Sequence, residues 1–167
     1  MTSACNVQFT DVEFEVTLSN SLQHFHHISG LKHEQKLSLE TVAQKRDVFR
    51  ILPTGFGKCL IFQLLPRLLK DLWKLQSACV LVVTPLVSIM KDQVEELTRL
   101  GLRAFAIGLG NEKGEKELVA GGFNVDLLYG SPEMLSSKQW SKQLKEGLLR
   151  KQTVCFVGDE AHYVSAW

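Results

Sequence analysis

The sequence has no strong excess of charge of either sign. Its 167 residues contain 19 lysines and arginines and 18 aspartates and glutamates, which gives a formal net charge of +1. A chain so nearly neutral exerts no overall attraction on nucleic acid, so any nucleic-acid binding must depend on a local group of residues. The chain also has no basic start followed by an apolar stretch, and no apolar run long enough to cross a bilayer. We therefore expect a soluble protein without a secretory signal or a membrane partner.

Cysteine is scarce and shows no paired spacing. The four cysteines are Cys5, Cys59, Cys79 and Cys155, and the last two stand inside apolar runs where we expect them to be buried. A reduced, intracellular compartment fits this pattern. The sequence also lacks internal repeats and low-complexity linkers. With 45% hydrophobic and 22% charged residues, the composition indicates one ordinary globular domain with a core of its own.

The most informative stretch of the chain runs from Ile51 to Leu60 and reads Ile-Leu-Pro-Thr-Gly-Phe-Gly-Lys-Cys-Leu. A short apolar strand is predicted over residues 48–52, followed by a glycine-bearing turn and a helix that starts near Lys58. Gly55 and Gly57 allow backbone conformations in which successive N–H groups point at one anion. Lys58 would reach the phosphates, and the helix N-terminus would add its positive dipole end. On these residues alone, an ordinary glycine turn between a strand and a helix remains the alternative.

Strands and helices alternate along the rest of the chain. We expect residues 1–16 to be a loose N-terminal segment and residues 17–167 to form one α/β domain, a mainly parallel sheet with helices on both faces. The apolar patterns predict further strands at 78–83, 103–107, 125–129 and 153–157, and helices at 17–28, 33–44, 58–72, 85–100 and 132–150.

Polar residues follow several of these predicted strands. Thr84 and Ser131 each precede a proline, Pro85 and Pro132, and this pair of residues is typical of an N-cap and the first position of a helix. Asp159 follows the last strand. Ligands of a parallel sheet bind at the carboxyl ends of its strands, so we expect these residues to share one sheet edge with the phosphate loop.

Two adjacent carboxylates, Asp159 and Glu160, can divide the work of nucleotide hydrolysis. Successive side chains at a strand end point in different directions. We therefore assign Asp159 to a Mg²⁺ ion and Glu160 to the attacking water. The plainer alternative is an acidic N-cap on a following turn.

The ordered motifs of this chain resemble those of the RecQ-like DNA helicases of superfamily two. The resemblance rests on Leu-Pro-Thr-Gly-Phe-Gly-Lys at 52–58, Thr-Pro-Leu-Val-Ser-Ile-Met-Lys-Asp-Gln at 84–93, Ser-Pro-Glu at 131–133 and Asp-Glu-Ala-His-Tyr-Val-Ser-Ala-Trp at 159–167. It covers the chain from about Leu31 to the last residue. It implies a RecA-like P-loop lobe that binds ATP and Mg²⁺ and couples ATP hydrolysis to 3′-to-5′ movement along single-stranded or branched DNA.

The resemblance also implies roles for single residues. Gln35 falls where the family keeps a glutamine that reads the adenine edge, and its alternative is a solvated glutamine at a helix start. The implied catalytic residues are Lys58, Asp159 and Glu160, and the implied nucleotide contacts are Gln35, Thr54, Gly55, Phe56, Gly57, Lys58, Cys59 and His162. The implied metal contacts are Asp159 and Cys59, and the implied DNA contacts are Thr84, Pro85, Ser88, Ser131 and Pro132. Without the family, the last group would simply be helix caps and starts, and the two roles are compatible.

Four departures from the family pattern stand out. Cys59 replaces the Ser or Thr hydroxyl that binds Mg²⁺, and Gly158 replaces a β-branched residue in the strand before Asp159. Ala166 replaces a glutamine or acidic residue. The chain also stops at Trp167, so the family's aromatic-rich loop, second RecA-like lobe and arginine finger would lie beyond it.

Two functions are consistent with these observations, and a third is disfavoured. The first is a RecQ-like ATP-dependent DNA helicase represented by its ATP-binding lobe, with the nucleus expected by resemblance and the cytoplasm as the alternative. The second is a stand-alone lobe that binds nucleotide or DNA without turnover, and it is favoured by Cys59 and the missing second lobe. An RNA helicase of the DEAD-box kind is disfavoured by His162 and by the sequence of residues 84–88.

Overall fold

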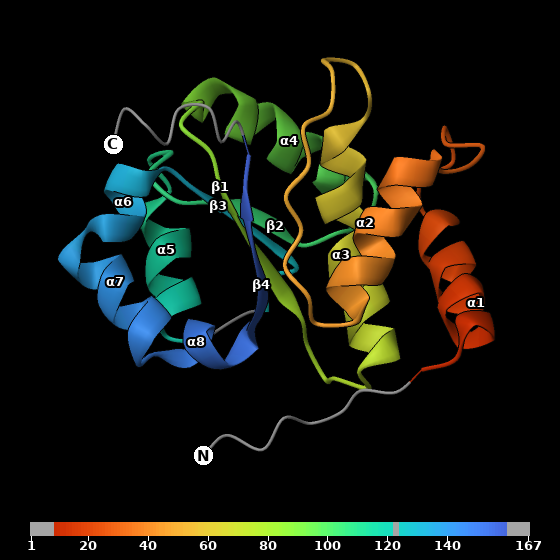
Figure 1. Cartoon of the computed structure of the whole chain (residues 1–167). Helices are drawn as coiled ribbons and strands as arrows, with labels where there is room; N and C mark the ends of the chain where they lie inside the picture. Colours follow the sequence, from red (N-terminus) through yellow and green to blue (C-terminus); the bar gives the residue numbers. More distant parts are fainter. Residues whose placement is uncertain (1–8, 122–123, 160–167) are drawn as a thin grey trace. The chain divides into compact units, whose positions relative to one another are not determined.

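The structure is a computed structural model that describes residues 9–121 and 124–159 of the chain (Figure 1). The chain divides into two compact units, Met1–Gln76 and Ser77–Trp167. Each unit is built around different elements.

The first unit is helical. Its helices are α1 (Asp11–Leu22), α2 (His33–Ala43) and α3 (Lys58–Leu72), and α3 contacts both of the others. Nine of the 15 residues of α3 are buried, as its predicted apolar character requires. The indole Nε1 of Trp73 donates a hydrogen bond of 3.0 Å to the carbonyl of Ala43, which ties the end of α3 to the end of α2. Helix α2 thus confirms the prediction for residues 33–44.

Helix α1 begins and ends six residues before the predicted bounds of 17–28. Its start is fixed by a capping box, in which the Thr10 hydroxyl accepts from the Glu13 N–H at 3.2 Å and the Glu13 carboxylate accepts from the Thr10 N–H at 2.7 Å. Hydrogen bonds from the N–H and the hydroxyl of Thr10 to this carboxylate lower the pKa of Glu13. The helix takes in residues 11–16, so the prediction of a loose segment was wrong there, and residues 1–8 lie outside the described part of the chain.

The strand predicted at residues 48–52 is not formed. The described part of the first unit, residues 9–76, contains helices and connecting segments and no strand, so this unit offers no ladder of hydrogen bonds for the segment to join. The side chains of Phe49 and Ile51 are 78% and 86% exposed. The apolar character of a segment predicts a strand, but a strand forms only where the backbone of another strand is available for hydrogen bonding.

The second unit contains a four-stranded parallel sheet in the order β2-β3-β1-β4. The strands are β1 (Cys79–Val83), β2 (Ala104–Ala106), β3 (Leu127–Gly130) and β4 (Thr153–Gly158). The central strand β1 pairs with β3 and β4, and Val83 lies opposite both Gly130 and Gly158. The predicted parallel α/β architecture is confirmed.

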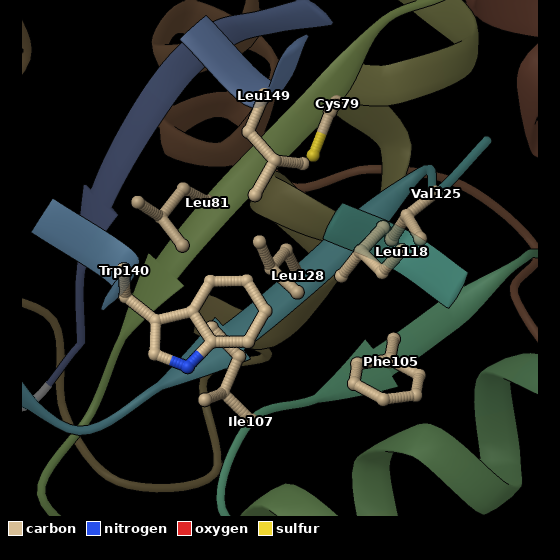
Figure 2. Close-up of a cluster of buried hydrophobic side chains, with 9 residues drawn as sticks. All are labelled: Cys79, Leu81, Phe105, Ile107, Leu118, Val125, Leu128, Trp140 and Leu149. Atoms are coloured by element: carbon tan, nitrogen blue, oxygen red, sulfur yellow. The ribbon is translucent and has the colours of Figure 1, made fainter. Parts of the chain in front are cut away.

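Helices cover both faces of this sheet. They are α4 (Val87–Arg99), α5 (Glu112–Val119), α6 (Pro132–Ser136), α7 (Lys138–Lys145) and α8 (Leu148–Gln152). On one face, Leu128 of β3 belongs to a buried cluster that includes Trp140 of α7 and Leu149 of α8 (Figure 2). Side chains alternate along a strand, so the next residue, Tyr129, faces the other way. Its hydroxyl lies 3.5 Å from Oε1 of Gln93 on α4.

Two helix predictions in this unit need correction. The single helix predicted from 132 to 150 is three short helices. The helical path is interrupted twice, because the backbone is extended at Ser137 (φ −59°, ψ 151°) and again at Gly147 (φ −81°, ψ −173°). Helix α4 begins at Val87, so Thr84 is not its N-cap. Instead, the Thr84 hydroxyl accepts from the N–H of Leu86 at 3.5 Å, in a local turn before the helix.

Two cysteines on the sheet, Cys79 and Cys155, differ in burial. Cys79 on the central strand is 1% exposed, and burial raises the pKa of its thiol to about 12. Cys155 lies on the edge strand β4 and is only half-buried, so the prediction that it is buried was wrong.

Among the described helices, none combines the length and the apolar character that a membrane span requires.

Gly158 is replaceable in this fold. A Cβ at Gly158 would meet no atom within 4 Å, so Gly158→Ala is expected to raise the free energy of unfolding by about 0.5–1 kcal/mol. The matched control is Gly130→Ala in β3, where the Cβ would lie 2.9 Å from Leu135 side-chain carbons, and this change is expected to destabilise. Urea unfolding of both variants measures the difference, and equal losses would mean that Gly158 is required.

Candidate functional site

The predicted phosphate loop lies in the first unit, directly before α3. It starts with a turn in which the N–H of Phe56 donates to the carbonyl of Pro53 at 3.2 Å. Gly55 has φ +77° within this turn, and Gly57 has φ +89° at the N-cap of α3. Both values lie in the left-handed region that favours glycine, as the sequence predicts.

The start of α3 has the chemistry of an anion site. Gly57 has no side chain that could cap the first-turn N–H groups, and the first turn contains no acidic residue. Lys58 and Cys59 stand half-buried on this turn, and Thr54 is exposed in the loop before it. Backbone donors and a positive dipole end beside a lysine suit a phosphate group.

Gln35 at the start of α2 contacts the loop directly. Its side chain is 3% exposed, so the alternative of a solvated glutamine was wrong. Its Nε2 lies 3.0 Å from the carbonyl of Gly57 and 3.3 Å from that of Phe56, and its Oε1 accepts from the N–H of Lys32 at 2.8 Å. The sequence placed Gln35 near the nucleotide, but it gave no sign of this contact with the loop. Adenine reading by Gln35 stays a prediction.

The second unit gathers three of the predicted site residues at the carboxyl edge of its sheet. Thr84 follows β1, Ser131 follows β3 and Asp159 follows β4. The backbone N–H of Thr84 donates to Gly130 at 3.2 Å, and that of Asp159 donates to Val83 at 2.9 Å. Parallel pairing therefore brings these three residues to one edge. That the phosphate loop shares this edge stays a prediction. Glu160 and His162 lie outside the described residues.

The predicted DNA contacts differ in exposure. Thr84 and Ser131 are only 2% and 6% exposed. The Ser131 hydroxyl caps α6, accepting from the N–H of Met134 at 3.3 Å, and its hydrogen bond to Glu133 lowers the pKa of that carboxyl group. Pro85 and Pro132 are half-buried, whereas Ser88 in the first turn of α4 is exposed. Ser131 is therefore a helix cap, and Ser88 presents the most accessible hydroxyl of the group.

A metal site made by protein side chains alone is not formed in the described part of the chain. No group of three or more His, Cys, Asp or Glu side chains within it could hold a metal ion. Mg²⁺ in nucleotide sites keeps several waters and binds one or two carboxylates together with phosphates. The carboxylate of Asp159 fits this chemistry, and the thiol of Cys59 fits it poorly.

Comparison with known proteins decides the family. The DEAD/DEAH box helicases match residues 32–167. The chain belongs to this family. This helicase-family chain is also 33% identical over 152 residues to the ATP-dependent DNA helicase hus2/rqh1 of Schizosaccharomyces pombe, an alignment that covers 87% of the chain and 11% of that protein.

Further relatives are of the same kind. The ATP-dependent helicase SGS1 of Saccharomyces cerevisiae is 33% identical over 147 residues, which cover 84% of the chain and 10% of that protein. The ATP-dependent DNA helicase RecQ of Synechocystis is 32% identical over 154 residues, 90% of the chain and 30% of that protein. The resemblance to RecQ-like helicases is confirmed, and the chain spans between a tenth and a third of the length of these relatives.

The two loop glycines allow a paired test. Gly55→Ala and Gly57→Ala should each lose about 1–2 kcal/mol of unfolding free energy, because alanine is strained at positive φ. A Cβ at Gly57 would also lie 2.7 Å from Gln35 Nε2, whereas one at Gly55 meets nothing within 4 Å. Gly57→Ala should therefore be the more destabilising change in urea unfolding. Equal losses would contradict the contact with Gln35.

Proposed function

We propose that this chain is the ATP-binding first RecA-like lobe of a RecQ-like DNA helicase. In such an enzyme the lobe would couple ATP hydrolysis to 3′-to-5′ unwinding of DNA. The observation that carries the proposal is the glycine-bearing loop at the start of α3, where Gly57 forms the N-cap and Lys58 the first helical residue. The relatives named above, described as ATP-dependent helicases, support the same assignment.

The nucleotide would bind through the loop and the first turn of α3. The N–H groups of residues 55–59 and the ammonium group of Lys58 would face the phosphates. Thr54 and Phe56 would line the loop, Gln35 would read the adenine edge, and His162 would contact the nucleotide. Bound Mg²⁺ would neutralise charge on the phosphates.

Hydrolysis would use the two adjacent carboxylates. Asp159, which the sheet holds by the 2.9 Å bond from its N–H to Val83, would hold the metal through its carboxylate. Glu160 would orient the attacking water. A second RecA-like lobe would be needed to complete the site, as the resemblance implies.

DNA would contact the carboxyl edge of the sheet in the second unit. Thr84, Pro85, Ser88, Ser131 and Pro132 would lie beside the phosphate backbone of single-stranded or branched DNA. Ser88, exposed in the first turn of α4, offers both a hydroxyl and a helix N-terminus to a phosphate. We place the protein in DNA repair and recombination, in the nucleus, with the cytoplasm as the alternative.

A second candidate function is a lobe that binds nucleotide or DNA without turnover. It is favoured by Cys59, which lacks the hydroxyl that Mg²⁺ prefers. ATP hydrolysis by the purified 167 residues, abolished by Glu160→Gln, would exclude this second function.

Different substitutions should impair nucleotide binding and nucleotide hydrolysis. Lys58→Ala removes a charged donor to the phosphates and should weaken ATP binding by about 1.5–3 kcal/mol. Glu160→Gln should leave binding near normal, because its proposed role begins only with the attacking water. A fluorescent-nucleotide titration of both variants tests this. Binding that is unchanged by Lys58→Ala would overturn the proposed nucleotide site.

Cys59→Ser should restore the missing hydroxyl on the first turn of α3. We expect Mg-ATP to bind more tightly by on the order of 1–3 kcal/mol, because Mg²⁺ prefers a hard oxygen ligand to a neutral thiol. Binding of ATP in chelator should barely change, since the backbone donors and Lys58 remain. Calorimetry with and without Mg²⁺ measures both. The same Mg²⁺ dependence in the two proteins would mean that the hydroxyl is dispensable here.

A further inference from the structure

Two side chains at the start of α2, those of the N-cap Lys32 and of Gln35, contact two backbone carbonyls of the phosphate loop. The ammonium Nζ of Lys32 lies 3.1 Å from the carbonyl oxygen of Phe56 and 4.1 Å from the centre of the Phe56 ring. Gln35 Nε2 donates to the same carbonyl at 3.3 Å and to the carbonyl of Gly57 at 3.0 Å. Both loop carbonyls are therefore held toward the start of α2.

The direction of a carbonyl fixes the direction of the next N–H group. In a trans peptide the C=O of one residue and the N–H of the following residue point to opposite sides, and the described chain contains no cis peptide bond. Because the carbonyl groups of Phe56 and Gly57 point toward α2, the N–H groups of Gly57 and Lys58 point away from it. An anion site of backbone donors requires its N–H groups to share one side.

We propose that Lys32 is a positioning residue of the phosphate loop, which acts through Phe56. Its ammonium group holds the peptide between Phe56 and Gly57 in the orientation that turns the Gly57 N–H toward a bound phosphate. This inference rests on the proposed nucleotide site. It differs from a direct contact between Lys32 and the base or the phosphates.

The ring of Phe56 has a part in this arrangement. A lysine at an exposed position moves freely, and Lys32 is exposed. An ammonium group over an aromatic face is attracted by the ring, which keeps Nζ beside the carbonyl of the same residue. Phe56 therefore supplies both the acceptor and the surface that retains the donor. The amide of Gln35 completes the clamp from a buried position.

The test compares three phosphate ligands in chelator: ATP, GTP and inorganic tripolyphosphate. Lys32→Met should weaken the binding of all three by the same factor, roughly three- to tenfold, because it disturbs backbone donors that serve any phosphate chain. Phe56→Leu should act in the same direction, and the double variant should lose less than the product of the two single losses. Lys32→Arg should restore binding to within about twofold of the original protein.

Lys36→Met is the matched control. Lys36 lies in α2 and its ammonium group forms an ion pair with Glu15 of α1, so its loss should leave all three affinities unchanged. A second measurement needs no ligand. The NMR amide signal of Gly57 should shift in Lys32→Met and stay in place in Lys36→Met.

Each contrary result has a distinct meaning. A loss confined to ATP would make Lys32 a base contact, and a loss for all three ligands that Phe56→Leu does not reproduce would make it a direct phosphate ligand. Either result overturns the proposal, as does an unmoved Gly57 signal. If ligand binding proves insensitive to Lys58→Ala, the proposed function fails instead, and the Gly57 signal still decides whether Lys32 orients the loop.

Discussion

The central strand β1 is hydrogen-bonded along both of its edges, to β3 on one side and to β4 on the other. Its backbone is buried, so each polar group on it needs a partner. Because both pairings are parallel, the three strands end at the same edge. That is the physical reason why Thr84, Ser131 and Asp159, which are far apart in sequence, follow strands that end side by side. The position of the candidate DNA and metal contacts depends on this pairing.

In the first unit, the comparable constraint is the conformation of two peptides before α3. Positive φ at Gly55 and Gly57 makes the loop possible, but it does not choose the side to which the N–H groups turn. Hydrogen bonds from Lys32 and Gln35 to the loop carbonyls favour one side, and the Gly57 carbonyl also accepts from the N–H of Leu60 in α3 at 3.3 Å. The loop is thus shaped by its own glycines and oriented by a helix that begins more than 20 residues earlier in the chain. The proposed phosphate site depends on both.

Much of the fold was predictable from local patterns. Helix α2 and the strands β1 to β4 were predicted close to their observed positions, because alternating or continuous apolar runs report which faces are buried. The glycine conformations of the phosphate loop and the carboxyl-edge position of Asp159 were predictable for similar reasons. The start of α1 at Asp11 was missed although its capping box, Thr10 and Glu13, stands in the sequence.

By itself, the sequence determined the family, the positions of α2, α3 and the four sheet strands, and the residue types of the candidate site. Only the tertiary structure decided that residues 48–52 form no strand in the first unit, since pairing depends on which backbone is near. It also decided that Ser131 is buried as a cap while Ser88 is exposed. Most of all, it decided that Gln35 and Lys32 hold the carbonyl of Phe56. Hydrogen bonds between distant segments follow from packing in three dimensions, and periodicity along the chain does not predict them.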